Sequence, residues 1–591
     1  MLKDKLYVRS LGVVDFHEAL SIQNAFHSND DDYLLLLEHN PIFTCGSGIQ
    51  EENLLDVKNS GIKVVDIDRG GDVTFHGPGQ LIGYPIITLG ETRGDLRNTI
   101  AFLRSLEEVI IEALKILGIQ AIRFEKYTGV WIDLGPEYKY NDRYKKIAAI
   151  GSKVSRGRTK HGFALNVSTD LSYFDKIIPC GIEQFGVTSL HELGHTNITF
   201  DQVIDTVTKT FLNEFNYNEI DIASHSFDEK EYNTDSEDEE TTASKRSFPA
   251  SRSALAFEPV ASSSTPDQGD LSRFSVESVS AIQPSLRLLG RLSKAGVRVD
   301  LEKDRRKRPD WMKNTIKQTE GFKELKELSK DLNLVSVCEE AGCPNIYECW
   351  ESKTATYMIL GENCTRACSF CLVGTNKPAP PDTNEPKNVA IAIKTLGIKH
   401  AVITCVARDD LEDDGSTQFV NTVNEVRKAS PGTQIELLIS DNRGHENSLD
   451  KIFNSRPDIL NHNIETPIRI QRAVRPSANY ARSLGVLTRA KEQGLKTKSG
   501  IIVGMGETNT EILQTLRDLK NANIDIVTIG QYLQPTPTHL PVDRFVTPAE
   551  FDEFKRYGES IGIPHVESGP LVRSSYHAAE AVDNLTEKIK S

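Results

Sequence analysis

Six cysteines in the second half of the chain constrain its fold and chemistry more than any other feature. They form two groups of three, C-x4-C-x5-C and C-x3-C-x2-C, and comprise Cys338, Cys343, Cys349, Cys364, Cys368 and Cys371. A structural zinc site closes with four nitrogen or sulfur ligands, and no histidine lies among these cysteines. An iron–sulfur cube held by three thiolates leaves one iron open. Two such clusters fit the spacing best. The alternatives are one four-thiolate zinc site with two spare thiols, or disulfides, which require an oxidising compartment.

The second group of cysteines has an aromatic residue, Phe370, directly before its last member. The run CTRACSFC at 364–371 resembles the signature of radical S-adenosylmethionine enzymes. That resemblance implies a partial (β/α) TIM barrel and a [4Fe-4S] cluster whose open iron binds S-adenosylmethionine. It also places the aromatic ring of Phe370 near the adenine.

Six further blocks extend the resemblance over nearly all of the chain after residue 309. The run CEEAGCPNIYECW at 338–350 resembles the auxiliary-cluster motif of the lipoyl synthase family, and the other blocks are NHNIET (461–466), VRPSANYARSL (474–484), TKSGIIVGMGET (497–508), TIGQYLQPT (528–536) and VRSSYHA (572–578). The family inserts sulfur at C6 and C8 of a protein-bound octanoyl chain. Unactivated C–H bonds have no acid–base route, so a radical cofactor must carry that step.

The same resemblance implies roles for individual residues. A second [4Fe-4S] cluster on the first group of cysteines is the sulfur source, and Ser575 is its displaceable fourth ligand. Ser574 is an alternative ligand, and either serine could instead cap a terminal helix at 577–589. Asn463, Glu465 and Arg475 are candidates for the S-adenosylmethionine pocket. The chain departs from the family at Ala407, where a carboxylate is usual.

The first half of the chain carries a different constellation. Cys180 lies in FDKIIPCGI, and upstream blocks are RGGDVTFHGPGQ (69–80), KKIAAIG (145–151) and HGFALNV (161–167). Together these blocks resemble the octanoyltransferase family, which has the biotin/lipoate protein ligase-like fold. The resemblance implies transfer of octanoyl from octanoyl-acyl carrier protein to a lipoyl-domain lysine through an acyl group on Cys180.

The residues suit that chemistry. Only a thiolate attacks a thioester efficiently, and the family places Lys146 beside Cys180, where it favours the thiolate and later takes a proton. The implied substrate site comprises Arg69, Gly70, Gly71, Asp72, Val73, Thr74, Phe75, His76, Ala149, Ile150, Gly151, Gly162, Phe163 and Ala164. Each residue also has a plainer interpretation. Cys180 could be a small buried apolar residue, Lys146 a solvated charge and His76 a hydrogen-bonding fixture, and Cys45 is interpreted as packing.

Composition predicts the organisation of the chain. At 591 residues two or three domains are expected. Residues 1–222 alternate strand-like and helical runs, whereas residues 223–299 are acidic and then rich in Ser, Ala and Pro, as disordered linkers are. Residues 300–591 repeat a βα rhythm. The predicted fold is therefore α/β multidomain: an N-terminal biotin/lipoate protein ligase-like α+β domain, a disordered linker and a C-terminal radical SAM barrel. The stretch LRLLGRLSKAGVRV at 286–299 is either a short amphipathic piece of linker or the leader of a fused second protein.

Charge and thiol usage limit the function classes. A net charge of −15 argues against a nucleic-acid binder, and no apolar run reaches the length of a membrane span. Reduced thiols point to a reducing compartment. We expect the cytoplasm, or the mitochondrial matrix or plastid in a eukaryote.

The combined prediction is a bifunctional lipoate-synthesis enzyme. Its expected partners are octanoyl-acyl carrier protein, the lipoyl domains of 2-oxoacid dehydrogenase E2 subunits and glycine cleavage H protein, and an electron donor such as ferredoxin or flavodoxin. Two alternatives remain at this point. One is another radical SAM sulfurtransferase fused to an ATP-dependent lipoate ligase-like domain, and the other is a zinc-stabilised binding scaffold.

Overall fold

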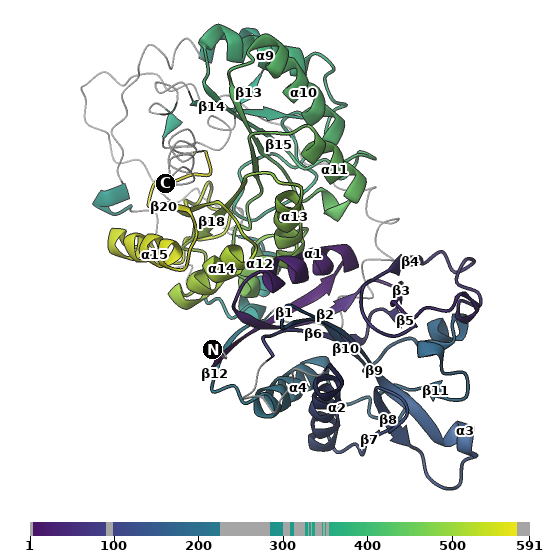
Figure 1. Cartoon of the computed structure of the whole chain (residues 1–591). Helices are drawn as coiled ribbons and strands as arrows, with labels where there is room; N and C mark the ends of the chain where they lie inside the picture. Colours follow the sequence, from purple (N-terminus) through teal and green to yellow (C-terminus); the bar gives the residue numbers. More distant parts are fainter. Residues whose placement is uncertain are drawn as a thin grey trace, which may run out of the picture.

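The structure is a computed structural model that describes residues 4–89, 99–224, 284–299, 308–312, 326–328, 330–332, 334–336, 345–346, 349 and 354–575. It contains two α/β units, each built around its own sheet and lying against the other (Figure 1). Most of the predicted linker, Cys338, Cys343 and the predicted terminal helix at 577–589 lie outside the described residues.

The N-terminal unit is built on a mixed nine-stranded sheet with strand order β12-β1-β2-β6-β10-β9-β8-β7 and β11 paired to β9. Its strands are β1 (Lys5–Val14), β2 (Asp32–His39), β6 (Gln80–Ile86), β7 (Ile122–Arg123), β8 (Val130–Asp133), β9 (Tyr144–Ser155), β10 (Arg158–Asn166), β11 (Gly186–Val187) and β12 (Glu219–Ser224). A smaller sheet, β4-β3-β5, flanks it and comprises β3 (Ile42–Cys45), β4 (Lys63–Asp66) and β5 (Val73–His76).

Both faces of the large sheet are covered by helices, because successive strand residues point to opposite sides. Leu6 and Val8 of β1 pack with α2 (Thr99–Ile116) and α4 (Phe200–Glu214). Tyr7 points to the other face, where α1 (Phe16–His27) lies. Helix α4 begins with a reciprocal capping box between Thr199 and Gln202, which satisfies otherwise free N–H groups. The connection at 135–144 between β8 and β9 contains the short helix α3 (Tyr140–Arg143).

The C-terminal unit is built on an eight-stranded sheet whose strands follow chain order, β13 to β20. Strand β13 pairs antiparallel to β14, and every later neighbour is parallel. The strands are β13 (Val335–Ser336), β14 (Thr354–Ile359), β15 (His400–Cys405), β16 (Gln434–Leu438), β17 (Ile459–Asn461), β18 (Thr497–Val503), β19 (Ile526–Gln531) and β20 (His565–Gly569). The helices between them are α9 (Glu385–Leu396), α10 (Ser416–Ala429), α11 (Glu446–Asn454), α12 (Ile468–Val474), α13 (Tyr480–Glu492), α14 (Asn509–Asn521) and α15 (Pro548–Ser560). This repeated βα order confirms the radical SAM fold class.

Residues 284–299, which composition assigns to the end of the linker, are part of the C-terminal unit. Helix α5 (Leu286–Lys294) is capped by the Ser285 side chain. Leu288 and Leu292 pack in one hydrophobic cluster with residues of α12. The amphipathic pattern of this stretch therefore serves packing, and we place the start of the C-terminal unit near residue 284 instead of 300.

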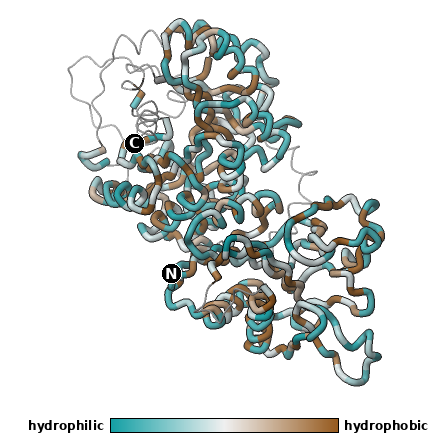
Figure 2. The backbone as a smooth tube through the Cα atoms, viewed as in Figure 1, coloured by the Kyte–Doolittle hydropathy of each residue, from teal (hydrophilic) through white to brown (hydrophobic). Residues whose placement is uncertain are grey.

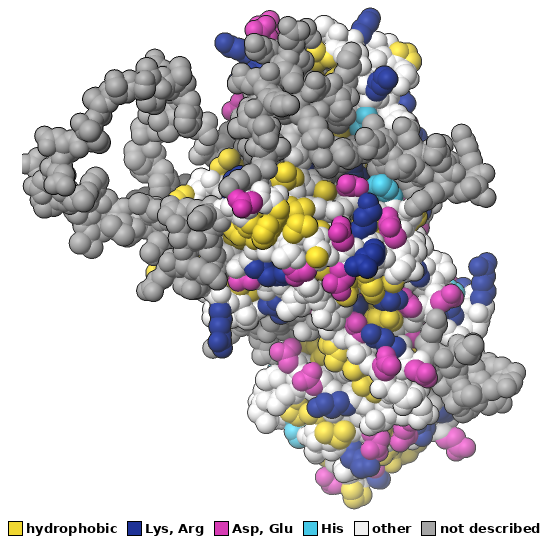
Figure 3. All heavy atoms as spheres, turned by 90° about the vertical axis from the view of Figure 1, so that its left-hand side faces the viewer, with side chains coloured by type: hydrophobic (Ala, Val, Ile, Leu, Met, Phe, Trp, Pro, Cys, Tyr) yellow, Lys and Arg dark blue, Asp and Glu magenta, His cyan; other side chains and the backbone are white. Residues whose placement is uncertain are grey.

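Among the side chains coloured in Figure 3, Lys and Arg are interspersed with Asp and Glu over the face in view. Hydrophobic residues alternate with hydrophilic ones along the helices and dominate the central strands (Figure 2). Among the described residues, no helix is long and apolar enough to cross a membrane.

Candidate active sites

In the N-terminal unit, Cys180 and Lys146 line one cavity of about 380 Å³. The floor of the cavity is formed by β9 and β10, and its rim by the loop that carries Cys180. Of the fourteen predicted substrate-site residues, twelve line this cavity; the exceptions are Val73 and Phe75. Both point to the other face of β5, where they pack in the hydrophobic cluster of the small sheet that also contains Cys45. Alternation along the strand is the reason that these two side chains lie outside the cavity.

The backbone of Cys180 has a left-handed conformation, with φ 57° and ψ 22°, inside the short 3-10 turn η3 (Pro179–Gly181). Residues other than glycine seldom adopt this region, and such outliers cluster at functional sites. The next residue, Gly181, is also left-handed, and a β carbon there would lie 2.9 Å from a carboxylate oxygen of Asp72. Asp72 is itself held by the Asn53 amide, which donates to it at 2.5 Å. The turn therefore holds the half-buried thiol at the edge of the cavity.

Lys146 is a buried lysine on β9, with only 5% of its surface exposed. Its Nζ donates to the backbone carbonyl of Thr128 at 3.1 Å and lies 4.9 Å from the centre of the Trp131 ring. These contacts direct the amine into the cavity and leave further N–H donors for a ligand, since an ammonium has three. The interpretation of Lys146 as a solvated surface charge is therefore wrong.

The cavity wall is shaped by close backbone packing. A β carbon at Gly162 would lie 2.1 Å from the carbonyl oxygen of Gly83 on the neighbouring strand. Any side chain at this position would push β10 away from β6. The glycine therefore lets strand backbone itself form part of the floor, which suits an extended apolar chain.

His76 is a buried, neutral residue. Its Nδ1 lies 2.8 Å from the Gln80 side-chain oxygen and its Nε2 lies 3.2 Å from Thr44 Oγ1. Burial lowers the pKa of His76 to about 3, so the ring is uncharged at neutral pH. With both ring nitrogens engaged, this geometry supports a role in fixing the shape of the cavity over one in proton transfer.

Several residues that line the cavity were not predicted from the sequence. They include Phe16, Tyr84, Leu103, Thr128 and His161. His161 directly precedes Gly162 in a block that the sequence singled out, so that block was the available signal. Phe16, the first residue of α1, and Leu103 of α2 come from helices whose patterns indicate only burial, and nothing in the sequence ties them to Cys180.

In the C-terminal unit, the second group of cysteines lies on the loop after β14. Cys368 and Cys371 line a cavity of about 1130 Å³, which is also lined by residues of α5 and α12. Backbone contacts hold the loop on both sides: Cys364 N–H donates to Gly374, Ser369 N–H donates to Val474, and a ring nitrogen of His539 lies 2.9 Å from the carbonyl oxygen of Cys371. Phe370 packs in the cluster formed by α5 and α12.

The donor set of this loop fits an iron–sulfur cube. It offers three thiols within eight residues, Cys364, Cys368 and Cys371, and a cube held by three thiolates leaves one iron open. Among the described residues, no group of three or more His, Cys, Asp or Glu is arranged to hold a single metal ion. Burial raises the pKa of the Cys371 thiol to about 12 and also raises that of Cys368. A cationic cluster is the kind of ligand that would deprotonate such thiols.

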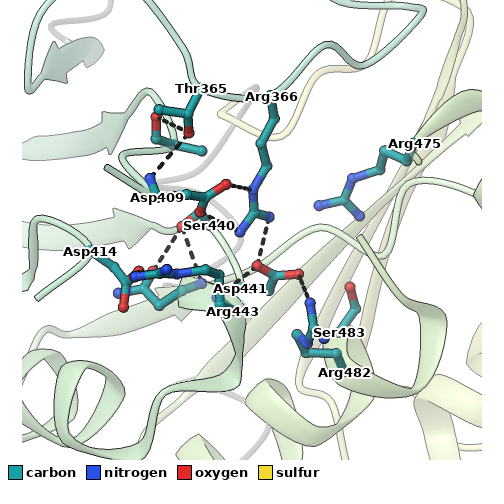
Figure 4. Close-up of polar contacts among 12 residues, drawn as sticks. Thr365, Arg366, Asp409, Asp414, Ser440, Asp441, Arg443, Arg475, Arg482 and Ser483 are labelled. Atoms are coloured by element: carbon teal, nitrogen blue, oxygen red, sulfur yellow. Dashed lines mark hydrogen bonds and ion pairs between the residues drawn. The ribbon is translucent and has the colours of Figure 1, made fainter. Parts of the chain in front are cut away.

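An arginine inside the cysteine loop anchors it to the sheet (Figure 4). Arg366 donates from Nε and Nη2 to Asp409, at 2.8 Å each, and its Nη1 lies 2.6 Å from the carboxylate of Asp441. Asp441 in turn lies 3.6 Å from Arg482 of α13. Although burial alone would raise it, these arginines hold the pKa of Asp441 well below its usual value. Paired buried charges of this kind fix the position of the loop.

The three predicted residues of the S-adenosylmethionine pocket lie together. Arg475 donates to the Asn463 carbonyl at 3.2 Å, and its charge partly offsets the effect of burial, which raises the pKa of the Glu465 carboxyl. Glu465 has a left-handed backbone, with φ 66°. The Asn463 side-chain oxygen has no hydrogen-bond partner among the described residues. A polar ligand with N–H donors would satisfy the Asn463 oxygen and bind beside the strained Glu465.

Comparison with known proteins finds a match for each of the two units. The family model "Lipoyl protein ligase A/B catalytic domain" matches residues 15–212, and the family model "Radical SAM superfamily" matches residues 358–519. The lipoyl synthase of Rubrobacter xylanophilus is 50% identical over 285 residues, which is 48% of this chain and 89% of that protein. The lipoyl synthase of Chlorobium limicola is 49% identical over 284 residues, 97% of its length. The C-terminal half of the chain belongs to the lipoyl synthase family.

Solved structures similar to the two halves are more distant. Lipoate-protein ligase A bound with ATP is 19% identical and covers 38% of this chain and 90% of its own, with a TM-score of 0.30. Methylornithine synthase is 16% identical and covers 46% of this chain and 89% of its own, with a TM-score of 0.29. The family models and the curated relatives show that the chain joins a ligase A/B-type catalytic domain to a half that belongs to the lipoyl synthase family.

The predicted auxiliary site of the lipoyl synthase half is described in part. Cys349 is buried, and its N–H donates to the Asn345 carbonyl at 3.0 Å. The Asn345 amide donates to the Leu571 carbonyl at 2.6 Å, four residues before Ser575. This contact brings the helical turn of Cys349 close to the segment that carries the predicted serine ligand.

The departure from the lipoyl synthase family at Ala407 leaves the cysteine loop anchored. The Ala407 carbonyl accepts hydrogen bonds from both the N–H and the hydroxyl of Thr365, each at 3.0 Å. These contacts use backbone, so they do not depend on the side chain at 407. Neighbouring Cys405 lies on β15, and burial raises the pKa of its thiol to about 12. A protonated thiol inside the sheet serves packing.

Proposed function

We propose that the chain is a bifunctional lipoate-synthesis enzyme. Residues 1–222 transfer an octanoyl group from octanoyl-acyl carrier protein to a lysine of a lipoyl domain, and the lipoyl synthase half then inserts two sulfur atoms at C6 and C8. The observation that carries the first activity is the cavity of about 380 Å³ that Cys180 and Lys146 both line. The second activity is supported by family membership and by the loop of three cysteines beside the large cavity.

In the transfer reaction, Cys180 is the nucleophile. Its thiolate attacks the donor thioester, the donor thiol leaves with a proton from the Lys146 ammonium, and an octanoyl thioester forms on Cys180. The lysine amine of the lipoyl domain then attacks this thioester, an amide forms, and Cys180 is released as a thiolate. Lys146 is positioned to stabilise the thiolate as an ammonium and, once neutral, to take the proton of the attacking amine. The acyl chain lies along the glycine-lined floor.

In the sulfur-insertion half, the chain supplies binding and position. Cys364, Cys368 and Cys371 would hold a [4Fe-4S] cluster, which with S-adenosylmethionine supplies the one-electron chemistry that breaks unactivated C–H bonds. Arg366 holds the loop in place through Asp409 and Asp441. Asn463, Glu465 and Arg475 would bind the polar end of S-adenosylmethionine. The first group of cysteines with Ser575 would hold a second cluster that provides the sulfur.

The partners follow from these reactions. The proposed substrates are octanoyl-acyl carrier protein and the lipoyl domains of E2 subunits and glycine cleavage H protein, and the proposed electron donor is a ferredoxin or flavodoxin. Both halves use the octanoylated domain, one as product and one as substrate. Joining them raises its effective concentration at the second site.

A second candidate for the first half is an ATP-dependent lipoate ligase, because the matching family model spans both the A and B types. The two differ in their requirement for an acyl-cysteine. The deciding experiment supplies octanoyl-acyl carrier protein and apo lipoyl domain to the purified protein, without ATP, and follows the domain by mass spectrometry. Octanoylation of the domain supports the transferase. Octanoylation that requires free octanoate and ATP overturns it.

Replacing Lys146 tests its role in proton transfer. We expect Lys146→Met to slow octanoyl transfer roughly 10²- to 10⁴-fold, the range for loss of a positioned acid or base. The measurement is the initial rate of lipoyl-domain octanoylation across pH 6–9. The matched control is Lys145→Met on the same strand, whose residue does not line the cavity. An unchanged rate and pH profile in Lys146→Met would contradict the assignment.

A further inference from the structure

The two units share one hydrophobic core. A single buried cluster combines Leu11, Ile22 and Phe26 of the N-terminal unit with Leu484 of α13 and Leu516 of α14 in the C-terminal unit. All five are at most 4% exposed. The composition of residues 223–299 predicts two independent units on a disordered linker. A shared core of this kind is instead typical of permanent interfaces, which resemble a domain core cut in two.

A buried ion pair crosses the centre of this contact. Arg9 of β1 donates from Nε to both carboxylate oxygens of Asp518 on α14, at 2.9 Å each. Tyr480 of α13 and Tyr33 of β2 donate their hydroxyls to the same carboxylate, at 3.0 Å and 3.3 Å. The side chains of Arg9 and Asp518 are 1% and 2% exposed. A buried pair with every oxygen engaged fixes the register of two surfaces more than it adds affinity.

Polar contacts surround this centre. Arg517 of α14 lies 3.0 Å from Asp31 of the N-terminal unit, and Asn521 donates to both Asp31 and the Tyr33 hydroxyl. The Asn479 amide donates to the Val13 carbonyl at 3.1 Å. An apolar centre with a polar rim is the usual anatomy of a specific interface.

Helix α13 has a gap in its side chains where α1 crosses it. Gly485 is a buried helical glycine, and a β carbon there would lie 2.9–3.2 Å from three atoms of Glu18 on α1. Those three atoms are its nearest neighbours outside its own helix, and all belong to the other unit. Glycine costs helix stability relative to other residues, so its presence here serves the approach of the two helices.

We propose that the two units are permanently docked through this interface, made by α1, β1 and β2 on one side and α13 and α14 on the other. The interface, and not the segment 225–283, fixes the relative position of the two active sites. This inference does not depend on the reactions proposed above.

Helix α1 is connected to both active-site regions. Phe16, at the start of α1, lines the transferase cavity. Two residues further on, Glu18 lies 3.4 Å from Arg482. Arg482 in turn lies 3.6 Å from Asp441, which pairs with Arg366 of the cysteine loop. The side chains that hold α1 in place are therefore connected by ion pairs to the loop that carries Cys364, Cys368 and Cys371.

The proposal is tested by proteolytic cleavage of the folded full-length protein between the two units. A protease recognition sequence is inserted within residues 240–280, the native protein is cleaved, and the product is run on size-exclusion chromatography at about 1 µM. We expect the two fragments to co-elute at the volume of the uncut protein. Separate elution of the two fragments overturns the proposal.

A large side chain at the point where α1 crosses α13 tests this interface specifically. Gly485→Trp is expected to weaken association of the cleaved fragments roughly 10- to 100-fold, the cost of overpacking a close contact. The matched control is Gly432→Trp, where an added β carbon meets no atom within 4 Å. Fragments of Gly485→Trp that associate as tightly as those of Gly432→Trp contradict the proposed interface.

A charge reversal in the polar contacts around the interface provides a second test if Gly485→Trp impairs folding. Arg517→Glu places two carboxylates opposite each other at Asp31 and is expected to weaken association of the cleaved fragments several-fold. The double variant Asp31→Arg with Arg517→Glu restores opposite charges and is expected to recover most of the loss. No loss in the single variant, or no recovery in the double variant, contradicts the proposed contact.

Discussion

Cys180→Ser is expected to abolish octanoyl transfer, lowering its rate at least about 10³-fold, while sulfur insertion into a pre-octanoylated domain continues. A serine hydroxyl of similar size fits the same turn but is a far weaker nucleophile toward a thioester, since only the thiolate is activated near neutral pH. Two assays measure the effect: octanoylation of apo lipoyl domain, and lipoyl formation on domain that already carries octanoate.

The acyl intermediate can be located directly. Mass spectrometry of the protein given octanoyl-acyl carrier protein alone should show an octanoyl adduct on Cys180. Cys45→Ser is the matched control, because Cys45 is a buried residue of the small sheet and does not line the cavity. An adduct on Cys45, or full transfer activity in Cys180→Ser, would overturn the mechanism.

The sequence predicts the architecture of this chain well, because the patterns that define it are local. The βα rhythm predicted for residues 300–591 corresponds to strands such as β15, β16, β18 and β19 and the helices between them. The glycine-rich blocks of the first half likewise meet around one cavity. Each block carries its own turn or strand signal, and the resemblance to known families supplies their order in space.

The features that the sequence does not predict depend on contacts between distant segments. Arg9 and Asp518 lie 509 positions apart, and each by itself reads as a surface charge in an alternating or helical pattern. The amphipathic face of α1 predicts that the helix packs against something, but not that its partner is α13 of the other unit. Composition favours the opposite conclusion, because a long polar linker suggests that the two units do not pack against each other.

Replacing one or the other group of cysteines is expected to abolish different steps of the sulfur-insertion reaction. Alanine at Cys364, Cys368 and Cys371 removes the electron source, so cleavage of S-adenosylmethionine to 5′-deoxyadenosine should stop. Alanine at Cys338, Cys343 and Cys349 should leave that cleavage in place while lipoyl product disappears, because this group is proposed to hold the sulfur source. Chromatographic detection of 5′-deoxyadenosine and mass spectrometry of the lipoyl domain measure the two outcomes separately.

Iron content gives an independent readout of the same variants. Anaerobically purified protein with both clusters should hold about eight irons, and either triple variant about half that number, since each cube has four. Octanoyl transfer serves as the internal control, because the Cys180 cavity shares no residue with either group of cysteines. A variant that loses transfer as well has lost its fold and says nothing about the clusters. Lipoyl product from the first-group variant would contradict the sulfur-source assignment, because the enzyme would then take its sulfur from elsewhere.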